Sequence, residues 1–373
     1  MSTGYAVRPH RPGDEEGIVK LLELVFDGWP QIDIPGSPLD YWRWKHGSKP
    51  NESICSMCEH DNQIVGCHHM KPLKIKVLDE TVLGATSMDL AVHPDHRKLG
   101  FLNQLRDLSV GSAKKAGIKF TYYITGNPVM IKRLSRLGRP FPHPMANLVR
   151  IQDVDRQLKA IPVNNAWAMK LGFQMSKLMN DLKNAFQKSE PLKKEFEIVQ
   201  IDGFDEGINA FWEKTSSHYD YIVERDKDYL NWKYCDPRTG DYVIKGALEN
   251  GCLLGYVVLR INRYRKDYPV GYVVDLLAIP NRNDAAAALI KDSIRYFDDQ
   301  KINIVNYQVV SNHPYEQLIK NQGFLKSNID FHFFYVPFGG KDDIQISDRI
   351  IPEKFFSSWG DHDVLPVSMP RYE

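Results

Sequence analysis

The chain has 373 residues, of which 43% are hydrophobic and 25% are charged, so it is globular and too long for one ordinary domain. Its 48 Lys and Arg residues nearly balance 47 Asp and Glu residues. The formal net charge of +1 excludes a global field that would collect nucleic acid or an anionic membrane surface. We therefore expect neither a nucleic-acid partner nor a membrane partner.

The start of the chain and its cysteines favour a cytoplasmic location. Residues 1–5 lead directly into a predicted strand without the apolar core of a signal peptide, and no apolar run approaches the roughly 20 residues that span a bilayer. Five cysteines, an odd number, argue against a disulfide framework. Cys55 and Cys58 have the spacing of a metal pair, but they fall on opposite faces of a predicted strand. We therefore interpret them as buried thiols and predict no metal.

Hydrophobic periodicity predicts interleaved strands and helices in the first part of the chain. In chain order, we predict a strand at 5–9, helices at 14–27 and 38–46, strands at 53–61, 63–77 and 83–93, a helix at 99–116, a strand at 119–125, a helix at 128–137 and a strand at 145–151. A short turn at 78–81 predicts a hairpin, whereas the 99–116 helix is long enough to cross over to a parallel strand. The expected fold class is therefore α/β with a mixed (α+β) sheet.

Four landmarks of the first half recur in the same order about 185 to 190 residues later. They pair Glu16-Gly17-Ile18 with Glu206-Gly207-Ile208, Asp40-Tyr41 with Asp228-Tyr229, Leu90-Ala91 with Leu277-Ala278, and Asn127-Pro128 with Asn312-His313-Pro314. The alternative explanation is the alternation of helix and strand that any α/β domain shows. We predict tandem domains at 1–151 and 195–338, a connecting helix and linker at 152–194, and a C-terminal extension at 339–373.

Two segments outside these copies have patterns of their own. Apolar residues recur at helical spacing over 164–188 and predict the connecting helix, whose lysines suit a solvated face or, alternatively, a membrane surface. The segment 355–363 contains a hydrophobic run and is expected to fold back on a domain. The alternative is that Asp361, His362 and Asp363 bind a cation.

The clearest local signal runs from Leu90 to Leu102, where a predicted strand ends, a tight turn follows and a helix begins. Unpaired backbone N–H groups and the positive end of the helix dipole favour an anion at such a junction. Gly100 lets a ligand approach the backbone, and Arg97 and Lys98 add positive charge for phosphates. We therefore predict a phosphate-binding turn.

This segment resembles the acetyl-CoA turn of the GNAT superfamily of N-acetyltransferases, whose pattern is V-x-P-x-x-[RQ]-x-x-G-x-[GA]. Val92, Pro94, Arg97 and Gly100 match the pattern, whereas Leu102 stands where the family has a small residue. The resemblance implies that a coenzyme A thioester, acetyl-CoA, is the co-substrate.

The resemblance covers residues 4–151 and has a fainter echo over 195–336, so it implies two tandem GNAT-like domains. The residues expected to contact the coenzyme are Leu90, Ala91, Val92, Arg97, Lys98, Leu99, Gly100, Phe101, Leu102 and Asn127. The corresponding turn of the second copy has no glycine and places Asp284 where phosphates would lie, so it should repel them. We expect the coenzyme in the first copy only, and a structural or acceptor-shaping role for the second.

GNAT chemistry implies direct attack of a primary amine on the thioester, which needs a general base. Asp89 precedes the segment expected to pair with pantetheine and is the first candidate, with a hydrogen-bonded structural role as the alternative. His68 and His69 are the next candidates. Because adjacent strand residues face opposite sides, at most one of these histidines enters the cleft.

Many GNAT enzymes also carry a tyrosine that protonates the leaving thiolate, but Leu134 occupies that position here. Tyr122, Tyr123 or water must then supply the proton. The aromatic cluster Tyr41-Trp42-Trp44 either lines an acceptor pocket or packs in the core.

We predict an acyl-CoA-dependent N-acyltransferase that transfers acetyl from acetyl-CoA to a small amine, an amino sugar or a peptide acceptor. Two alternatives remain at this point. One is a non-catalytic sensor or scaffold that binds acyl-CoA or an amine, and the other is an aminoacyl or longer-acyl transferase on the same fold.

Overall fold

The computed structural model describes residues 4–47, 52–160, 196–339, 346 and 349–362. The first half contains β1 (Tyr5–Pro9), α1 (Glu15–Phe26), α2 (Pro38–Gly47), β2 (Ile54–His60), β3 (Gln63–Val77), β4 (Glu80–Val92), α3 (Phe101–Lys115), β5 (Phe120–Thr125), α4 (Pro128–Leu137), β6 (Arg139–Pro140), β7 (Met145–Ile151) and α5 (Val154–Ala160). These elements confirm the predicted order of strands and helices up to residue 151. The predicted connecting helix at 164–188 lies outside the described residues.

The second half repeats the same alternation. It contains β8 (Glu197–Ile201), α7 (Gly207–Ser216), β9 (Tyr221–Val223), α8 (Lys227–Leu230), β10 (Tyr242–Glu249), β11 (Cys252–Asn262), β12 (Val270–Ala278), α9 (Asn283–Asp298), β13 (Ile304–Val310), α10 (Pro314–Lys320), β14 (Leu325–Pro337) and the short 3₁₀ turn η5 (Trp359–Asp361). The fold class is mixed α/β, as predicted. Among the described residues, no helix is both long and apolar enough to cross a membrane.

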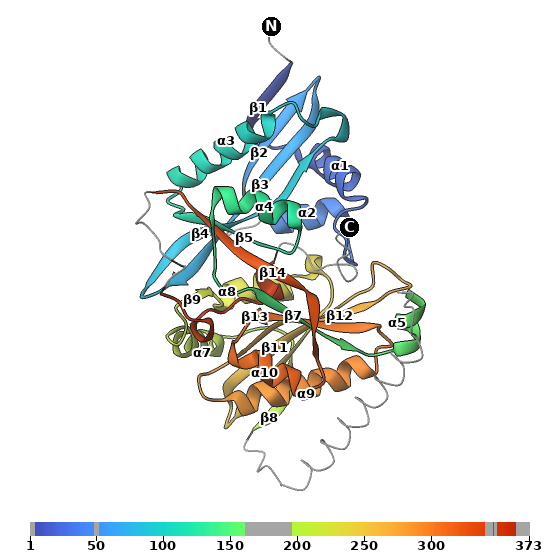
Figure 1. Cartoon of the computed structure of the whole chain (residues 1–373), viewed down its shortest axis with the longest axis vertical. Coiled ribbons are helices and arrows are strands. Elements are labelled where there is room, and N and C mark those ends of the chain that lie inside the picture. The colour runs from blue at the N-terminus through green and yellow to red at the C-terminus, as the bar shows by residue number, and fades with distance from the viewer. Residues whose placement is uncertain (1–3, 48–51, 161–195, 340–345, 347–348, 363–373) are drawn as a thin grey trace.

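The strands form one sheet in which the two halves exchange their last strands. The order along the sheet is β1-β2-β3-β4-β5-β14-β7-β13-β12-β11-β10-β8. β14 of the second half pairs antiparallel with β5 of the first, and β7 of the first half pairs with β13 of the second. In Figure 1, β14 runs diagonally from the lower half of the molecule to the upper half, which joins the two copies into one body.

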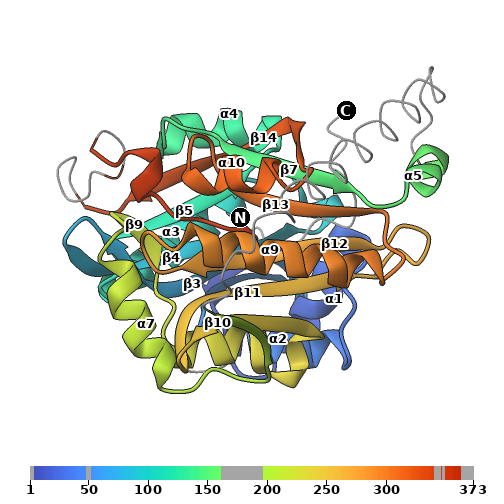
Figure 2. The same ribbon diagram turned by 90° about the horizontal axis from the view of Figure 1, so that it is seen from below.

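Helices cover both faces of the upper half of the sheet. Helices α1 and α2 pack on one face, where Ile18, Leu22 and Cys55 belong to one apolar cluster. Helix α3 covers the other face, where Cys58 packs with Phe101 in a separate cluster. The two cysteines therefore lie on opposite faces of β2, as the period of a strand predicts. In the lower half, α9 and α10 lie along the outer side (Figure 2).

Both copies contain a pair of parallel strands that diverge. β4 and β5 pair only at Ala85–Thr121 and Thr86–Tyr122, so β4 separates from its neighbour over residues 87–92. β12 and β13 pair over 270–272 and then separate in the same way. Each copy thus has a V-shaped opening in its sheet, and the first of these openings positions the candidate site.

Candidate functional site

The turn after β4 has the geometry of a backbone anion site. Lys98 and Gly100 have φ angles of +67° and +85°, and α3 begins at the next residue. A Cβ at Gly100 would meet no atom within 4 Å, so the glycine is required by its φ angle and leaves room for a ligand. A hollow of about 320 Å³ lies here, lined among others by Leu90, Val92 and Arg97.

A β-bulge interrupts β4 directly before this hollow. Cys67 of β3 pairs with Ala91 and His69 pairs with Met88, so Asp89 and Leu90 together face one residue of β3. Asp89 adopts a left-handed φ of +45°. The bulge re-aims neighbouring side chains: Leu90 lines the hollow at the α3 end, whereas Asp89 lines a second cavity.

The second cavity, of about 260 Å³, lies between the two copies on the side of α1 and α2. Its walls contain several aromatic side chains, among them Trp29, Tyr41 and Trp44 from the first copy and Trp232, Tyr242 and Trp359 from the second half of the chain. Its charged lining residues are Lys45, Lys71, Asp89 and Lys233. The predicted aromatic cluster thus contributes Tyr41 and Trp44 to a cavity, while Trp42 is buried against α1.

Asp89 sits at the centre of a buried hydrogen-bond network. Its carboxylate accepts from Trp29 Nε1 at 2.8 Å, pairs with Lys45 Nζ at 2.8 Å and contacts His46 Nε2 at 2.8 Å. Burial alone would raise the pKa of Asp89, but the Lys45 charge and the His46 hydrogen bond outweigh burial and hold the pKa well below its usual value. Such a carboxylate is an anchor for donors and a weak proton acceptor.

His69 lies in the core behind Asp89. Its ring stacks on His46 with centroids 4.1 Å apart, its Nδ1 lies 3.1 Å from the Asp89 carbonyl, and Trp42 donates to its Nε2. Burial lowers the pKa of His69 well below 6.5, so the ring is neutral. His69 faces the side of α1 and α2, but it is fully buried beneath the cavity wall.

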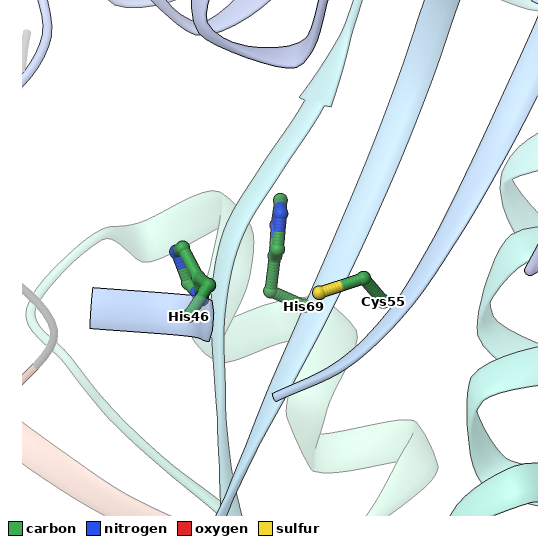
Figure 3. A group of neighbouring side chains, drawn as sticks. All are labelled: His46, Cys55 and His69. Atoms are coloured by element: carbon green, nitrogen blue, oxygen red, sulfur yellow. The ribbon is translucent and has the colours of Figure 1, made fainter. Parts of the chain in front are cut away.

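His46, Cys55 and His69 bring their potential ligand atoms within 4.8 Å of one another (Figure 3). This grouping comes from a helix and two strands and was not apparent from the sequence. The nitrogens of both rings already take part in hydrogen bonds, including His46 Nδ1 with Ser53. The geometry is that of a hydrogen-bonded core, since stacked rings do not direct their lone pairs to one point.

The opposite face of the V-shaped opening holds His68 and Tyr123. His68 Nε2 lies 2.8 Å from Ser87 Oγ, and its Nδ1 lies 3.0 Å from Ser109 Oγ on α3. Tyr123 on β5 also hydrogen-bonds to Ser87, so these groups form one polar chain on the α3 side. Burial lowers the pKa of His68 to about 4 and raises that of Tyr123, so both are neutral near pH 7. The two predicted histidines therefore lie on opposite faces.

The remaining residues expected to bind coenzyme differ in exposure. Arg97, Lys98 and Leu99 are exposed in the turn, whereas Ala91 and Phe101 are packed in the core. The Asn127 side chain caps α4 by accepting from the Val129 and Met130 N–H groups. Only the backbone atoms of Ala91 and Phe101 remain for contact with a ligand, and the half-buried Asn127 is already engaged as a helix cap.

In the second copy, the residues of the corresponding turn are paired among themselves. Arg282 forms ion pairs with Asp284 at 3.0 Å and with Glu249 at 3.1 Å. Its positive charge is thus neutralised at the start of α9, where the first copy exposes Arg97 and Lys98.

The V-shaped opening of the second copy is occupied by the chain's own C-terminal segment. Asp361 pairs with the buried Arg225 at 2.9 Å, and Arg225 pairs with Asp275 of β12 at 3.0 Å. His362 hydrogen-bonds to Gln308 of β13. The segment therefore folds back on the second copy, and Asp361 is bound by an arginine. Asp363 lies outside the described residues.

Comparison with known proteins agrees with this geometry. Residues 6–134 match the family model described as an acetyltransferase (GNAT) domain. The matched residues lie within the first copy and include the turn from Arg97 to Gly100. A search of curated protein sequences finds no match.

Solved structures resemble the tandem GNAT arrangement at low sequence identity. N-myristoyltransferase of Saccharomyces cerevisiae with bound myristoyl-CoA has a TM-score of 0.59 at 11% identity, covering 98% of this chain and 86% of that chain. A probable N-acyltransferase of Enterococcus faecalis V583 has a TM-score of 0.58 at 10% identity, covering 90% and 73%. A GCN5-related N-acetyltransferase of Anabaena variabilis has a TM-score of 0.55 at 11% identity, covering 88% and 72%. The GNAT match and these neighbours support an acyl-CoA N-acyltransferase in general terms.

Three cavity lysines, Lys45, Lys71 and Lys233, were missed by the sequence prediction. Lys71 was the most accessible signal, because it ends the continuous buried run 65–71 of β3, where a lysine is unusual. Lys45 and Lys233 lie on helical segments, where lysines normally face solvent, so their inward direction appears only in the fold.

Proposed function

We propose that this protein is an acyl-CoA-dependent N-acyltransferase that transfers acetyl from acetyl-CoA to a primary amine, with one coenzyme site in the first copy. The observation that carries the proposal is the bulge of β4. It lies beside an open, unpaired stretch of strand and separates an anion-binding turn on one side from an aromatic cavity on the other.

In this arrangement the pyrophosphate would bind at the start of α3, near Arg97 and Gly100, and the pantetheine arm would follow β4 over residues 87–92. A backbone N–H at the bulge would donate to the thioester oxygen, where negative charge develops during attack. The acceptor would approach from the aromatic cavity beside Asp89.

The amine nitrogen attacks the thioester carbonyl carbon, so that a C–N bond forms and the C–S bond breaks. An acceptor that binds as an ammonium ion loses two protons. One leaves before attack, and the other ends on the sulfur of coenzyme A. The products are an amide, the free thiol and one proton.

Asp89 stays a candidate base for the proton that leaves the ammonium group before attack. Its carboxylate already interacts with three donors, however, and this favours a role in binding the acceptor. We propose that the carboxylate attracts the ammonium group of the acceptor and that water receives the proton. For the second proton we propose Tyr123, which is protonated at neutral pH and lies on the coenzyme side, joined through Ser87 to His68. Tyr123→Phe should then lower turnover with little change in coenzyme affinity.

The size of the cavity supports a short acyl group and a small acceptor, because about 260 Å³ must hold the acceptor and the reacting carbonyl. The competing functions are transfer of a longer acyl group and non-catalytic binding. Purified protein should therefore be given acetyl-, octanoyl- and myristoyl-CoA with pooled amines while free thiol is followed. Amine-dependent thiol release with acetyl-CoA is expected. Coenzyme binding without thiol release for any thioester would identify a sensor.

A further inference from the structure

The charges of the aromatic cavity narrow the choice of acceptor. We infer that the acceptor is a small amine that also carries a carboxylate group, such as an amino acid, and that Lys71 and Lys233 bind that carboxylate. The inference rests on the proposed function, since it concerns the acceptor side of the same site.

Among the described residues, three lysines and one aspartate line the cavity. Lys45 is paired with Asp89, which balances one positive charge against the single negative charge. The hydrogen bonds of Lys71 and Lys233 go to uncharged oxygens instead. The carboxylate of a ligand would give these two nitrogens an anionic partner, which no other described residue of the cavity lining provides.

Lys71 is 1% exposed, although its side chain ends in an amine that is charged when protonated. Its Nζ donates to the Lys45 carbonyl at 2.7 Å and lies 4.5 Å from the centre of the Trp232 ring. An ammonium group has three N–H donors, so these contacts leave capacity for a ligand. Burying a lysine in this way is costly without a strong acceptor, which a carboxylate supplies.

Lys233 reaches the same cavity from the second copy. Its Nζ donates to the Tyr229 hydroxyl at 2.8 Å and to the Gly360 carbonyl. These contacts fix the ammonium group at the cavity wall and also join it to the C-terminal segment. The carboxylate site is therefore built from both copies, which gives the second copy a role in acceptor binding.

The other end of the cavity suits the amine. Asp89 contributes its negative charge at the β4 bulge, where the thioester carbonyl is proposed to lie. Trp29 and Tyr41 stand beside it with rings 5.5 Å apart, and aromatic faces attract cations. An aminocarboxylate can thus place its ammonium group near Asp89 and its carboxylate near Lys71. A ligand with only an alkyl chain in this space would leave Lys71 and Lys233 without an anionic partner.

The first test is calorimetric titration of the unmodified full chain with matched probes: L-leucine and L-phenylalanine against isoamylamine and phenethylamine, which lack only the carboxylate. At least tenfold tighter binding of the amino acids is expected, because hydrogen bonds between charged groups are lost in the amines. Equal affinity for an amino acid and its amine, or no binding of any probe with and without acetyl-CoA, would overturn the inference.

Proton uptake gives a second readout on the same protein. Burial, together with the charges of Lys45 and Lys233, lowers the pKa of Lys71 to about 7, while Cys55 and Glu52 act in the opposite direction. A bound carboxylate favours the charged form, so binding at a pH of about 8.5 should take up roughly one proton, measured from the dependence of the heat on buffer ionisation. Amino acid binding without proton uptake would exclude Lys71 as the anchor.

The variants Lys71→Met and Lys233→Met should each weaken amino acid binding at least tenfold while leaving acetyl-CoA affinity unchanged. Lys74→Met is the matched control, because Lys74 lies on the same strand, is exposed and pairs with Glu224 at 3.1 Å. If the amines are acylated as fast as the amino acids, the inference fails while the proposed function stands. If amino acids bind but no thioester is consumed, the proposed function fails while the binding site stands.

Discussion

Replacing Asp89 with asparagine separates a positioning role from a role as general base. The carboxylate accepts hydrogen bonds from Trp29 and His46 and balances the buried charge of Lys45. Asparagine offers one acceptor oxygen and turns an NH₂ group toward donors, so the buried Lys45 loses its carboxylate partner. Breaking such a pair costs about 3–5 kcal/mol of unfolding free energy. In a chain of this length that corresponds to a melting temperature lower by roughly 5 °C.

The assay combines thermal unfolding, acetyl-CoA affinity and turnover for Asp89→Asn, Lys45→Met and the double variant. If Asp89 anchors the network, the double variant should recover much of the lost stability, because neither charge of the buried pair remains. If Asp89 is instead a base outside any network, turnover should fall by about 10² to 10⁴ with an unchanged melting temperature. An unchanged melting temperature in Asp89→Asn would refute the buried network derived from the structure.

Four further outcomes are expected. Gly100→Glu should weaken acetyl-CoA binding more than about 30-fold by placing a strained, negatively charged side chain at the proposed phosphate turn. The control Gly111→Glu, within α3, should not weaken it. Equal affinities of the two variants in calorimetry would contradict this site. Titration with acetyl-CoA should give one site per chain, weakened by Arg97→Ala and not by Arg282→Ala, and two equivalent sites would remove the asymmetry between the copies. Asp361→Asn should lower the unfolding free energy by about 3 kcal/mol, because it leaves the buried Arg225 with one carboxylate fewer; urea denaturation measures this, and a midpoint equal to wild type would count against it. Burial lowers the pKa of Lys71 to about 7, so between a pH of about 7 and about 10 the unfolded chain keeps a proton that the native Lys71 has released. The contribution of Lys71 to the unfolding free energy should therefore rise over this pH range. A comparison of wild type with Lys71→Met should show this slope only in the wild type.

Local pattern was sufficient for most elements of the first copy. β3 and α4 have the predicted bounds, because alternation and helical spacing are set by residues close together in the chain. The exchange of β7 and β14 was not predictable in this way. Either strand presents the same period-two pattern to whichever sheet it joins, so the choice depends on contacts between segments about 180 residues apart.

The candidate site, like the fold, was only partly predictable from the sequence. The conformation of the turn from Arg97 to Gly100 could be predicted, since the turn and the start of α3 depend on residues close together in the chain. That this turn binds an anion stays a prediction. Asp89 was correctly noticed as an unusual acid in an apolar strand, but its partners were not identifiable, because Trp29, Lys45 and His46 reach it from a loop and a helix. Local periodicity along the chain does not reveal ion pairs between residues of different helices and strands.

The two V-shaped openings differ in what can occupy them. In the first copy the opening beside β4 is flanked by an exposed Arg97 and a glycine turn, so an external ligand can supply the missing strand contacts. In the second copy the Arg225, Asp275 and Asp361 network holds the chain's own C-terminal segment in the equivalent opening. That segment brings Trp359 and Gly360 to the aromatic cavity, and Gly360 accepts from Lys233. The segment that fills the second opening is thus also a wall of the aromatic cavity, so the proposed acceptor site depends on the same contacts that close the second copy.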